Sequence, residues 1–268
     1  PGAVLARLLE RRALPGALHV APGARADQGH TGRRVVGAVL SSPAFLLGIA
    51  RVAGREGRDF WLCAAKASRA YLARACDPDT GMNPEYADYD GSAHVDERDH
   101  WHFYSDAYRT VANIGLDALW NGPIPELCER AAALQDFFLK HDRTCVYAID
   151  GTPVDMTVLH PTGFLAATAQ GALAAVHSSR RDAVRNASAW VQLLWNTPMR
   201  TGKRRYYDNF LYAFVVLALA GDIDTNVGDG RQMSGPIKMT GRVNRTNGLF
   251  NITAHSVAVD MNLGPSRI

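Results

Sequence analysis

The segment from His102 to Trp120 joins a run of polar and aromatic side chains to an apolar continuation. It contains an acid, Asp106, and a base, Arg109, with Tyr104 just before them. Carboxylates beside aromatic rings suit a carbohydrate ligand, because the rings pack on apolar sugar faces and the acids bind hydroxyl groups. Glycoside hydrolysis also needs two carboxyl groups, one to protonate the leaving oxygen and one to activate water. The segment therefore raises the hypothesis of a sugar-processing site.

Similar polar residues open two later apolar segments, and more stand in the long loop between residues 77 and 101. If the starts of these segments lie at one end of a helical barrel, their side chains converge on a cleft. The residues concerned are His160 for one segment, Arg204, Arg205, Tyr206, Tyr207 and Asp208 for the other, and Glu85, Tyr86, Asp88, Tyr89 and Asp90 in the loop.

Each of these residues also has a purely structural explanation. Asp106 at a helix start is stabilised by the helix dipole, and Arg109 is its natural partner one turn on. His102 and His160 fit as capping or packing residues, and the paired tyrosines 206 and 207 fit as core. The residue types alone leave both explanations open.

Apolar residues recur at three- and four-residue spacing from about residue 42, a pattern that predicts helices. One short strand is expected over 144–149. We therefore expect an all-α fold, with helices over residues 43–54, 58–76, 103–120, 124–141, 160–176, 181–196 and 206–220.

The predicted helices alternate between amphipathic ones and ones that are apolar nearly all round. An amphipathic helix needs one partner face, whereas an apolar one must be covered on every side. The alternation therefore indicates inner helices wrapped by outer ones, joined as antiparallel hairpins. About three hairpins are visible, and a closed double ring of this kind has about six, so we expect an incomplete toroid.

Composition narrows the classes of function. The chain has 268 residues, 47% of them hydrophobic and 21% charged, with a net charge of +3. The basic residues are spread along it, which disfavours nucleic acid as a partner. No apolar run reaches the roughly 20 residues of a membrane span. A P-loop, a dinucleotide fingerprint, a nucleophile elbow, a zinc-protease motif and a C-x-x-C pair are all absent from the sequence, so we expect no cofactor and no metal.

The organisation along the chain predicts three parts. Residues 1–41 are poorly specified, residues 42–221 form the partial barrel, and residues 222–268 form an irregular tail. The chain begins at Pro1 and shows no signal peptide. We expect a fragment of a longer protein, with a cytoplasmic location favoured.

Three stretches together resemble glycoside hydrolase family 8, and within it the reducing-end xylose-releasing exo-oligoxylanases. They are D-P-D-T-G-M-N-P-E-Y-A-D-Y-D-G (77–91), H-F-Y-S-D-A-Y-R-T-V-A-N-I-G-L-D (102–117) and R-Y-Y-D-N-F-L-Y (205–212). L-W-N-T-P (194–198) is similar to the approach to the last of them. The resemblance implies an (α/α)6 six-hairpin toroid that hydrolyses β-1,4-linked xylo-oligosaccharides with inversion.

The resemblance also implies roles for individual residues. Asp106 matches the general base, and Arg109 matches the arginine that would pair with and orient it. Tyr206 and Tyr207 match residues near the base and the sugar subsites, and His160 matches a loop histidine that limits the cleft. The expected substrate-binding set is Tyr86, His102, Tyr104, Arg109, His160, Arg205, Tyr206 and Tyr207.

One departure from the family pattern keeps alternatives open. The family's general acid is a glutamate in an earlier helical region, and residues 1–41 show no matching motif. The chain would then be a catalytically inactive barrel remnant that only binds oligosaccharide. Another (α/α)6 enzyme, such as a polysaccharide lyase, is a third reading, and β-glucan and chitosan remain alternatives to xylan.

Overall fold

The computed structural model describes residues 35–37, 41–96, 99–220, 241–243 and 250–252. They fall into two compact units with the boundary after Val216. Beyond the end of the last helix, the described residues of the smaller unit are one antiparallel pair of short strands, β5 (Gly241–Val243) and β6 (Phe250–Ile252).

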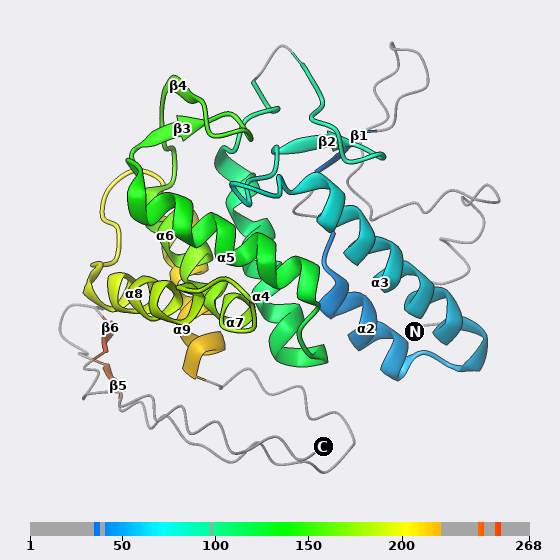
Figure 1. Ribbon diagram of the computed structural model, residues 1–268. Coiled ribbons are helices and arrows are strands. Elements are labelled where there is room, and N and C mark those ends of the chain that lie inside the picture. The colour runs from blue at the N-terminus through cyan, green and yellow to red at the C-terminus, as the bar shows by residue number, and fades with distance from the viewer. Residues whose placement is uncertain (1–34, 38–40, 97–98, 221–240, 244–249, 253–268) are drawn as a thin grey trace. The chain divides into compact units, whose positions relative to one another are not determined.

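Helices dominate the larger unit, as the sequence pattern predicts (Figure 1). A short 3-10 turn, η2 (Ser105–Ala107), precedes the third of them. In chain order the helices are α2 (Pro43–Val52), α3 (Arg55–Ala75), α4 (Tyr108–Asn121), α5 (Pro125–Lys140), α6 (Pro161–Gln170), α7 (Ala172–Ala175), α8 (Ala183–Asn196) and α9 (Arg205–Ala220).

The helices of the larger unit lie in two layers (Figure 1). In the inner layer α4 packs against α2 on one side and against α6 and α7 on the other. In the outer layer α5 lies between α3 and α8, and it also covers α7. The alternation of amphipathic and apolar helices therefore predicts the correct layering.

Glycine allows the inner helices to approach closely. A Cβ atom on Gly115 of α4 would lie 2.2 Å from the carbonyl oxygen of Gln170, at the end of α6. The Gln170 side-chain amide donates a hydrogen bond of 3.0 Å to the carbonyl oxygen of Ala112. The two helices thus meet backbone to backbone, and the buried polar side chain between them has a partner.

Aromatic rings fill the core between the two layers. The Phe164 ring centroid lies 5.1 Å from that of Tyr108 and 4.8 Å from that of Phe138, in the tilted and edge-on geometries that rings prefer. Trp190 of α8 is fully buried, and its indole N–H donates to the carbonyl oxygen of Gln135 at 3.0 Å. This core fixes the inner helices relative to the outer ones.

Two predicted helices differ from the structure. The helix expected from residue 103 begins only at Tyr108, because Phe103 pairs with Tyr147 as an isolated β-bridge and Ser105 has a φ of +42°. That left-handed conformation cannot continue a helix. The helix expected over 160–176 is two helices, α6 and α7, separated at Gly171. A Cβ atom there would lie 2.6 Å from a methyl of Val111.

Short strands brace the loops at one end of the helices. β3 (Cys145–Tyr147) lies in the expected strand and pairs with β4 (Pro153–Thr157), a stretch that the sequence pattern does not predict as a strand. β2 (Tyr86–Asp88) pairs with β1 (Val35–Gly37), inside the segment expected to be poorly specified. The β2 segment positions part of the candidate site.

Among the residues that the structure describes, no helix is both long and apolar enough to cross a lipid bilayer.

Candidate active site

Asp106 lies on η2, the tight turn that leads into α4. Its side chain is 38% exposed, and its two carboxylate oxygens contact donors on two different residues. Oδ2 lies 2.6 Å from the Arg109 guanidinium, one turn further along the chain. Oδ1 accepts a hydrogen bond of 3.0 Å from the hydroxyl of Tyr207, in the first turn of α9. The carboxylate is therefore held on two sides while part of it faces solvent.

Tyr207 is a stable donor for this contact. Burial raises the pKa of its hydroxyl, the Arg109 guanidinium opposes that shift, and the Asp106 carboxylate adds to it. The Arg109 guanidinium carbon lies 5.7 Å from the centre of the Tyr207 ring. The phenol keeps its proton throughout the neutral range and can only donate toward Asp106.

Glu85 lies directly beneath this turn and is almost fully buried, with 7% of its surface exposed. Burial raises the pKa of Glu85 to about 7, His100 opposes the shift, and the Asp106 charge reinforces it. Its carboxylate also lies near the backbone of Asp106, which lowers the pKa of Glu85 and so opposes part of the shift.

A second buried carboxylate, Asp208, anchors the other side of the site. It is fully buried, and its Oδ1 accepts the backbone N–H of Gly163 at 2.8 Å. Its Oδ2 forms a close ion pair with the guanidinium of Arg200. Asp208 thereby ties the start of α9 to the first turn of α6, where a backbone N–H favours a negative charge.

His160 lies between Asp208 and Tyr207, at the residue before α6. Its ring centroid is 4.1 Å from that of Tyr207, and its Nδ1 lies 3.6 Å from Asp208 Oδ2, which is too long for a hydrogen bond. Burial lowers the pKa of His160, although Asp208 opposes the shift. The structure thus joins Asp106, Tyr207 and His160 into one row from three segments of the chain.

Three other expected ligand residues belong to the loop beside Glu85. The backbone N–H of Glu85 donates to the carbonyl of His102 at 3.1 Å, and that of Tyr86 donates to the carbonyl of His100 at 2.9 Å. The Tyr86 ring packs on the His100 ring at 4.3 Å. His102 is buried in a bend, and Tyr104 is half-buried with an extended backbone, so neither lies in a helical turn as expected.

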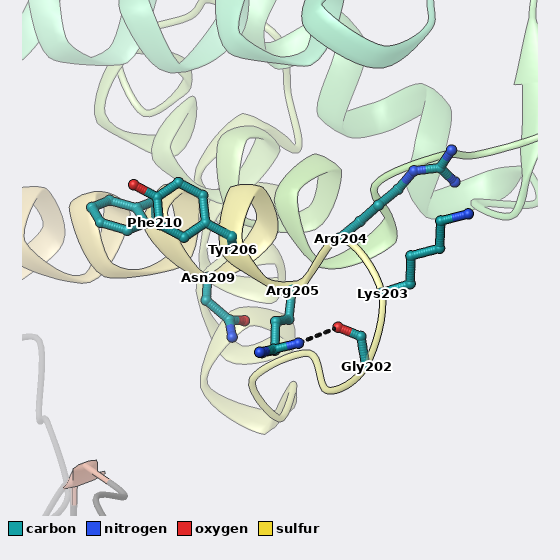
Figure 2. A pocket seen from close by; sticks show the side chains of 7 residues that line it. All are labelled: Gly202, Lys203, Arg204, Arg205, Tyr206, Asn209 and Phe210. Carbon is teal, nitrogen blue, oxygen red and sulfur yellow. Dashed lines mark hydrogen bonds between the residues drawn. The ribbon is translucent and has the colours of Figure 1, made fainter.

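Arg205 and Tyr206 are not brought to Asp106. They line an open hollow of about 410 Å³ at the start of α9, whose lining includes neither Asp106 nor Tyr207. Figure 2 shows Arg205 turned back to the loop, where it donates to the carbonyl of Gly202 at 3.0 Å, and the Tyr206 ring lying along that of Phe210. Neighbouring positions on a helix face different directions, which is why Tyr207 joins the site and Tyr206 does not.

The sequence places Glu85 and Asp208 among the polar residues expected at the cleft but gives them no specific role, and it does not single out Arg200. Glu85 and Asp208 stand out there only as polar residues of a loop and of a helix start. The contacts that define them are with the backbone of Asp106 and of Gly163. No sequence pattern predicts such contacts, because they join segments far apart in the chain. Among the described residues, no three histidine, cysteine or acidic side chains are grouped as a metal site would require.

No protein-family model matches the chain. It is similar to two curated proteins, each named reducing end xylose-releasing exo-oligoxylanase. The one from Bifidobacterium adolescentis is 72% identical over 179 residues, which cover 67% of this chain and 47% of that protein. The one from Halalkalibacterium halodurans is 47% identical over 182 residues, which cover 67% of this chain and 45% of that protein. The chain thus spans about half the length of these relatives.

The chain is also similar to solved structures of proteins that carry the same name as these relatives. A crystal structure of a reducing-end-xylose releasing exo-oligoxylanase superposes with a TM-score of 0.66 at 44% identity, covering 71% of this chain and 50% of that one. Rex8A from Paenibacillus barcinonensis, complexed with xylose, superposes with a TM-score of 0.64 at 42% identity, covering 70% of this chain and 49% of that one. These neighbours are (α/α)6 toroids, so the predicted fold class is confirmed for the matched part.

Proposed function

We propose that this chain, which belongs to glycoside hydrolase family 8 over the two thirds of its length that match, carries the water-activating side of a site that hydrolyses xylo-oligosaccharides. The observation that carries the proposal is the environment of Asp106. Its two oxygens are held by Tyr207 and Arg109, and its side chain remains partly open to solvent. A carboxylate placed in this way can receive a proton from water.

In the proposed reaction Asp106 is the general base. A water molecule beside Asp106 loses a proton to the carboxylate as its oxygen bonds to the anomeric carbon. The glycosidic carbon–oxygen bond breaks on the opposite face, and a second carboxyl group protonates the leaving oxygen, so the configuration inverts. Arg109 and Tyr207 fix the orientation of the base, which limits the directions from which water can be activated.

Glu85 is not the second carboxyl group of this scheme, although its pKa of about 7 is in the range expected of a general acid. Its side chain is buried next to the backbone of Asp106 itself. The acid of an inverting enzyme stands across the scissile bond from the base, roughly 6.5 to 9.5 Å away with sugar and water between them. We assign the acid to a part of the family fold outside the matched region.

The sugar subsite beside the base consists of Tyr207 and His160 in this proposal. Their rings lie against each other next to Asp106 and come from α9 and from the loop before α6. Such a wall suits a pyranose ring, which packs its apolar face on aromatic side chains. His160 would limit the cleft, and the loop residues Tyr86, His102 and Tyr104 would contact a further sugar. Xylose is the sugar assigned, since a relative's structure is a complex with xylose.

A chimera tests this proposal directly. The 179 matched residues of the Bifidobacterium adolescentis protein are replaced by the corresponding residues of this chain, and xylose release from xylotriose is measured. We expect hydrolysis, with the first product in the α configuration by proton NMR, because inversion of a β linkage gives that anomer.

The Asp106→Asn variant of the chimera supplies the decisive comparison. Loss of a general base lowers the rate by about 10²- to 10⁴-fold, so we expect its turnover to fall by at least about a hundredfold. The unaltered relative is the reference for expression and folding. A folded Asp106→Asn chimera that hydrolyses xylotriose as fast as the parent chimera would refute the assignment of the base.

A further inference from the structure

Arg200 lies in the loop between α8 and α9, and both its backbone and its side chain are bound to the first turns of α9. Its backbone N–H donates to the side-chain oxygen of Asn209 at 2.8 Å, and the Asn209 amide donates back to the Arg200 carbonyl oxygen at 3.0 Å. The preceding residue, Asp208, holds the Arg200 guanidinium. Two consecutive residues of α9 thus fix the position of Arg200.

One nitrogen of the Arg200 guanidinium makes two contacts. Its Nη1 donates to Oδ2 of Asp208 and, at 3.1 Å, to the carbonyl oxygen of Leu159. Leu159 immediately precedes His160 in the chain. The other oxygen of Asp208 accepts the backbone N–H of Gly163. The segment that carries His160 is therefore held on both sides, at Leu159 and at Gly163.

His160 lies close to the carboxylate oxygen that Arg200 occupies. Its Nδ1 is 3.6 Å from Asp208 Oδ2 and is a buried atom without a hydrogen-bond partner among the described residues. A buried carboxylate needs a cationic partner, so Arg200 and His160 are alternative partners for Asp208. With Arg200 bound there, the imidazole lies against the ring of Tyr207, at a centroid distance of 4.1 Å.

The groups around His160 favour its neutral form. Burial lowers the pKa of His160 below the ordinary 6.5, Asp208 opposes the shift, and the charges of Arg200 and Arg204 add to it. The Tyr207 hydroxyl keeps its proton and brings no charge to the ring. An imidazolium would be drawn to the Asp208 carboxylate far more strongly than a neutral imidazole. Loss of Arg200 would therefore free Asp208 and favour the protonation of His160 at the same time.

We propose that Arg200 is a positioning residue of the sugar subsite, which keeps His160 against Tyr207 by occupying the carboxylate of Asp208. The inference deepens the proposed function and rests on it for one point, namely that His160 and Tyr207 form the wall of that subsite. The effect of Arg200 on the substrate passes through His160. Without Arg200, the imidazole would turn toward Asp208 and away from the Tyr207 ring.

An NMR titration of the full chain tests this competition without any substrate. The ring C–H signals of His160 are identified by their absence from the spectrum of His160→Gln, and their pH dependence gives the pKa. In the parent chain we expect the pKa of His160 to lie below 6.5. In Arg200→Met, which keeps a long unbranched side chain without the charge, we expect a higher pKa and a weaker nuclear Overhauser contact between His160 and Tyr207.

Two further variants separate this role from simple packing. Arg200→Lys should resemble the parent chain, because both contacts come from one nitrogen and a lysine ammonium offers three donors from one nitrogen. The matched control is Arg204→Met, which removes another positive charge near His160 but leaves Asp208 its partner. It should raise the pKa of His160 less than Arg200→Met does and should leave the contact with Tyr207 in place.

The chimera with the Bifidobacterium adolescentis relative measures the consequence for the substrate. Arg200→Met should raise KM for xylotriose about threefold to tenfold, because the sugar loses part of its aromatic wall. Its kcat should stay within about twofold of the parent chimera, since Asp106 is held by Tyr207 and Arg109 and not by Arg200. Arg200→Lys should return KM to that of the parent chimera.

A pKa of His160 above 6.5 in the parent chain would overturn the proposal, and this measurement needs no variant that has to fold. An unchanged pKa in Arg200→Met, or equal increases in Arg200→Met and Arg200→Lys, would also overturn it. A chimera that leaves xylotriose intact refutes the proposed activity, and the titration still decides whether Arg200 positions His160. An active chimera whose KM is the same with and without Arg200→Met refutes the positioning role alone.

Discussion

The hydroxyl of Tyr207 donates a hydrogen bond of 3.0 Å to the carboxylate of Asp106, although the two residues stand 101 positions apart in the chain. The bond joins the start of α9 to the turn before α4, two inner helices that meet at the same end of the layer. It also leaves the other carboxylate oxygen to Arg109. This pair of contacts sets the direction in which Asp106 faces the solvent.

Removing the Tyr207 hydroxyl should therefore weaken catalysis more than stability. A hydrogen bond to a charged group contributes about 1.5 to 3 kcal/mol, so Tyr207→Phe should lower kcat of the chimera about tenfold to a hundredfold on xylotriose. The control is Tyr212→Phe, because that hydroxyl lies further along α9 and donates to the carbonyl of Leu194 in α8. Equal losses of kcat in both variants would mean that the Tyr207 hydroxyl contributes only to packing.

Glu85 should make the stability of the chain depend on pH. Its folded-state pKa of about 7 lies above the ordinary value of 4.5, so the folded chain binds the proton more tightly than the unfolded one. That contribution is fully present below about pH 4.5 and is lost as the pH rises through 7. It amounts to at most about 3 kcal/mol.

Urea unfolding between pH 4.5 and 8 measures this effect. Glu85→Gln should flatten the decline of the unfolding free energy with pH, since glutamine has nearly the same shape as glutamate but does not titrate. The facing charges, His100, Asp106 and Arg109, remain in both proteins. Glu126→Gln, at an exposed position of α5, should leave the profile as it is. If the unfolding free energy of Glu85→Gln declined with pH as steeply as that of the parent chain, Glu85 would not be the source of the decline.

Gly163 should tolerate no side chain. A Cβ atom there would lie 2.8 Å from Asp208 Oδ1 and 3.1 Å from a methyl of Leu211. Gly163→Ala should destabilise the chain by about 1 to 3 kcal/mol through overpacking, and it should separate α6 from α9. Gly48→Ala in α2 is the contrasting variant, because nothing lies within 4 Å of its new methyl and alanine favours the helix by about 1 kcal/mol. Thermal melts of both variants should shift in opposite directions.

The ion pair between Arg69 and Asp117 should be a major link between α3 and α4. Asp117 is buried and accepts two hydrogen bonds from the Arg69 guanidinium, at 2.8 and 3.0 Å. Asp117→Ala should cost about 3 to 5 kcal/mol, since it leaves a partly buried charge without its partner. The exposed pair of Lys140 and Asp136 provides the comparison, with a loss below about 1 kcal/mol for Lys140→Ala. Similar losses of stability in Asp117→Ala and Lys140→Ala would contradict the greater contribution of the buried pair.

Local pattern was sufficient for the presence of the helices and for their layers, but not for the start of α4 or for the division between α6 and α7. Apolar spacing identifies a buried face wherever it occurs, so the alternation of amphipathic and apolar helices predicts which ones lie inside. It could not predict the start of α4 at Tyr108. The left-handed Ser105 and the bridge between Phe103 and Tyr147 depend on a partner strand about forty residues away.

The candidate site also combines features that the sequence predicts with features that only the tertiary structure decides. The sequence by itself determined that Asp106 and Arg109 stand one helical turn apart, and the family resemblance singled them out. Tertiary structure alone decided that Tyr207 faces Asp106 while Tyr206 faces outward, and that Glu85 and Asp208 hold the turns behind them. Neighbours within a turn are set by helix geometry. Contacts between turns depend on how whole helices pack, which no short stretch of sequence encodes.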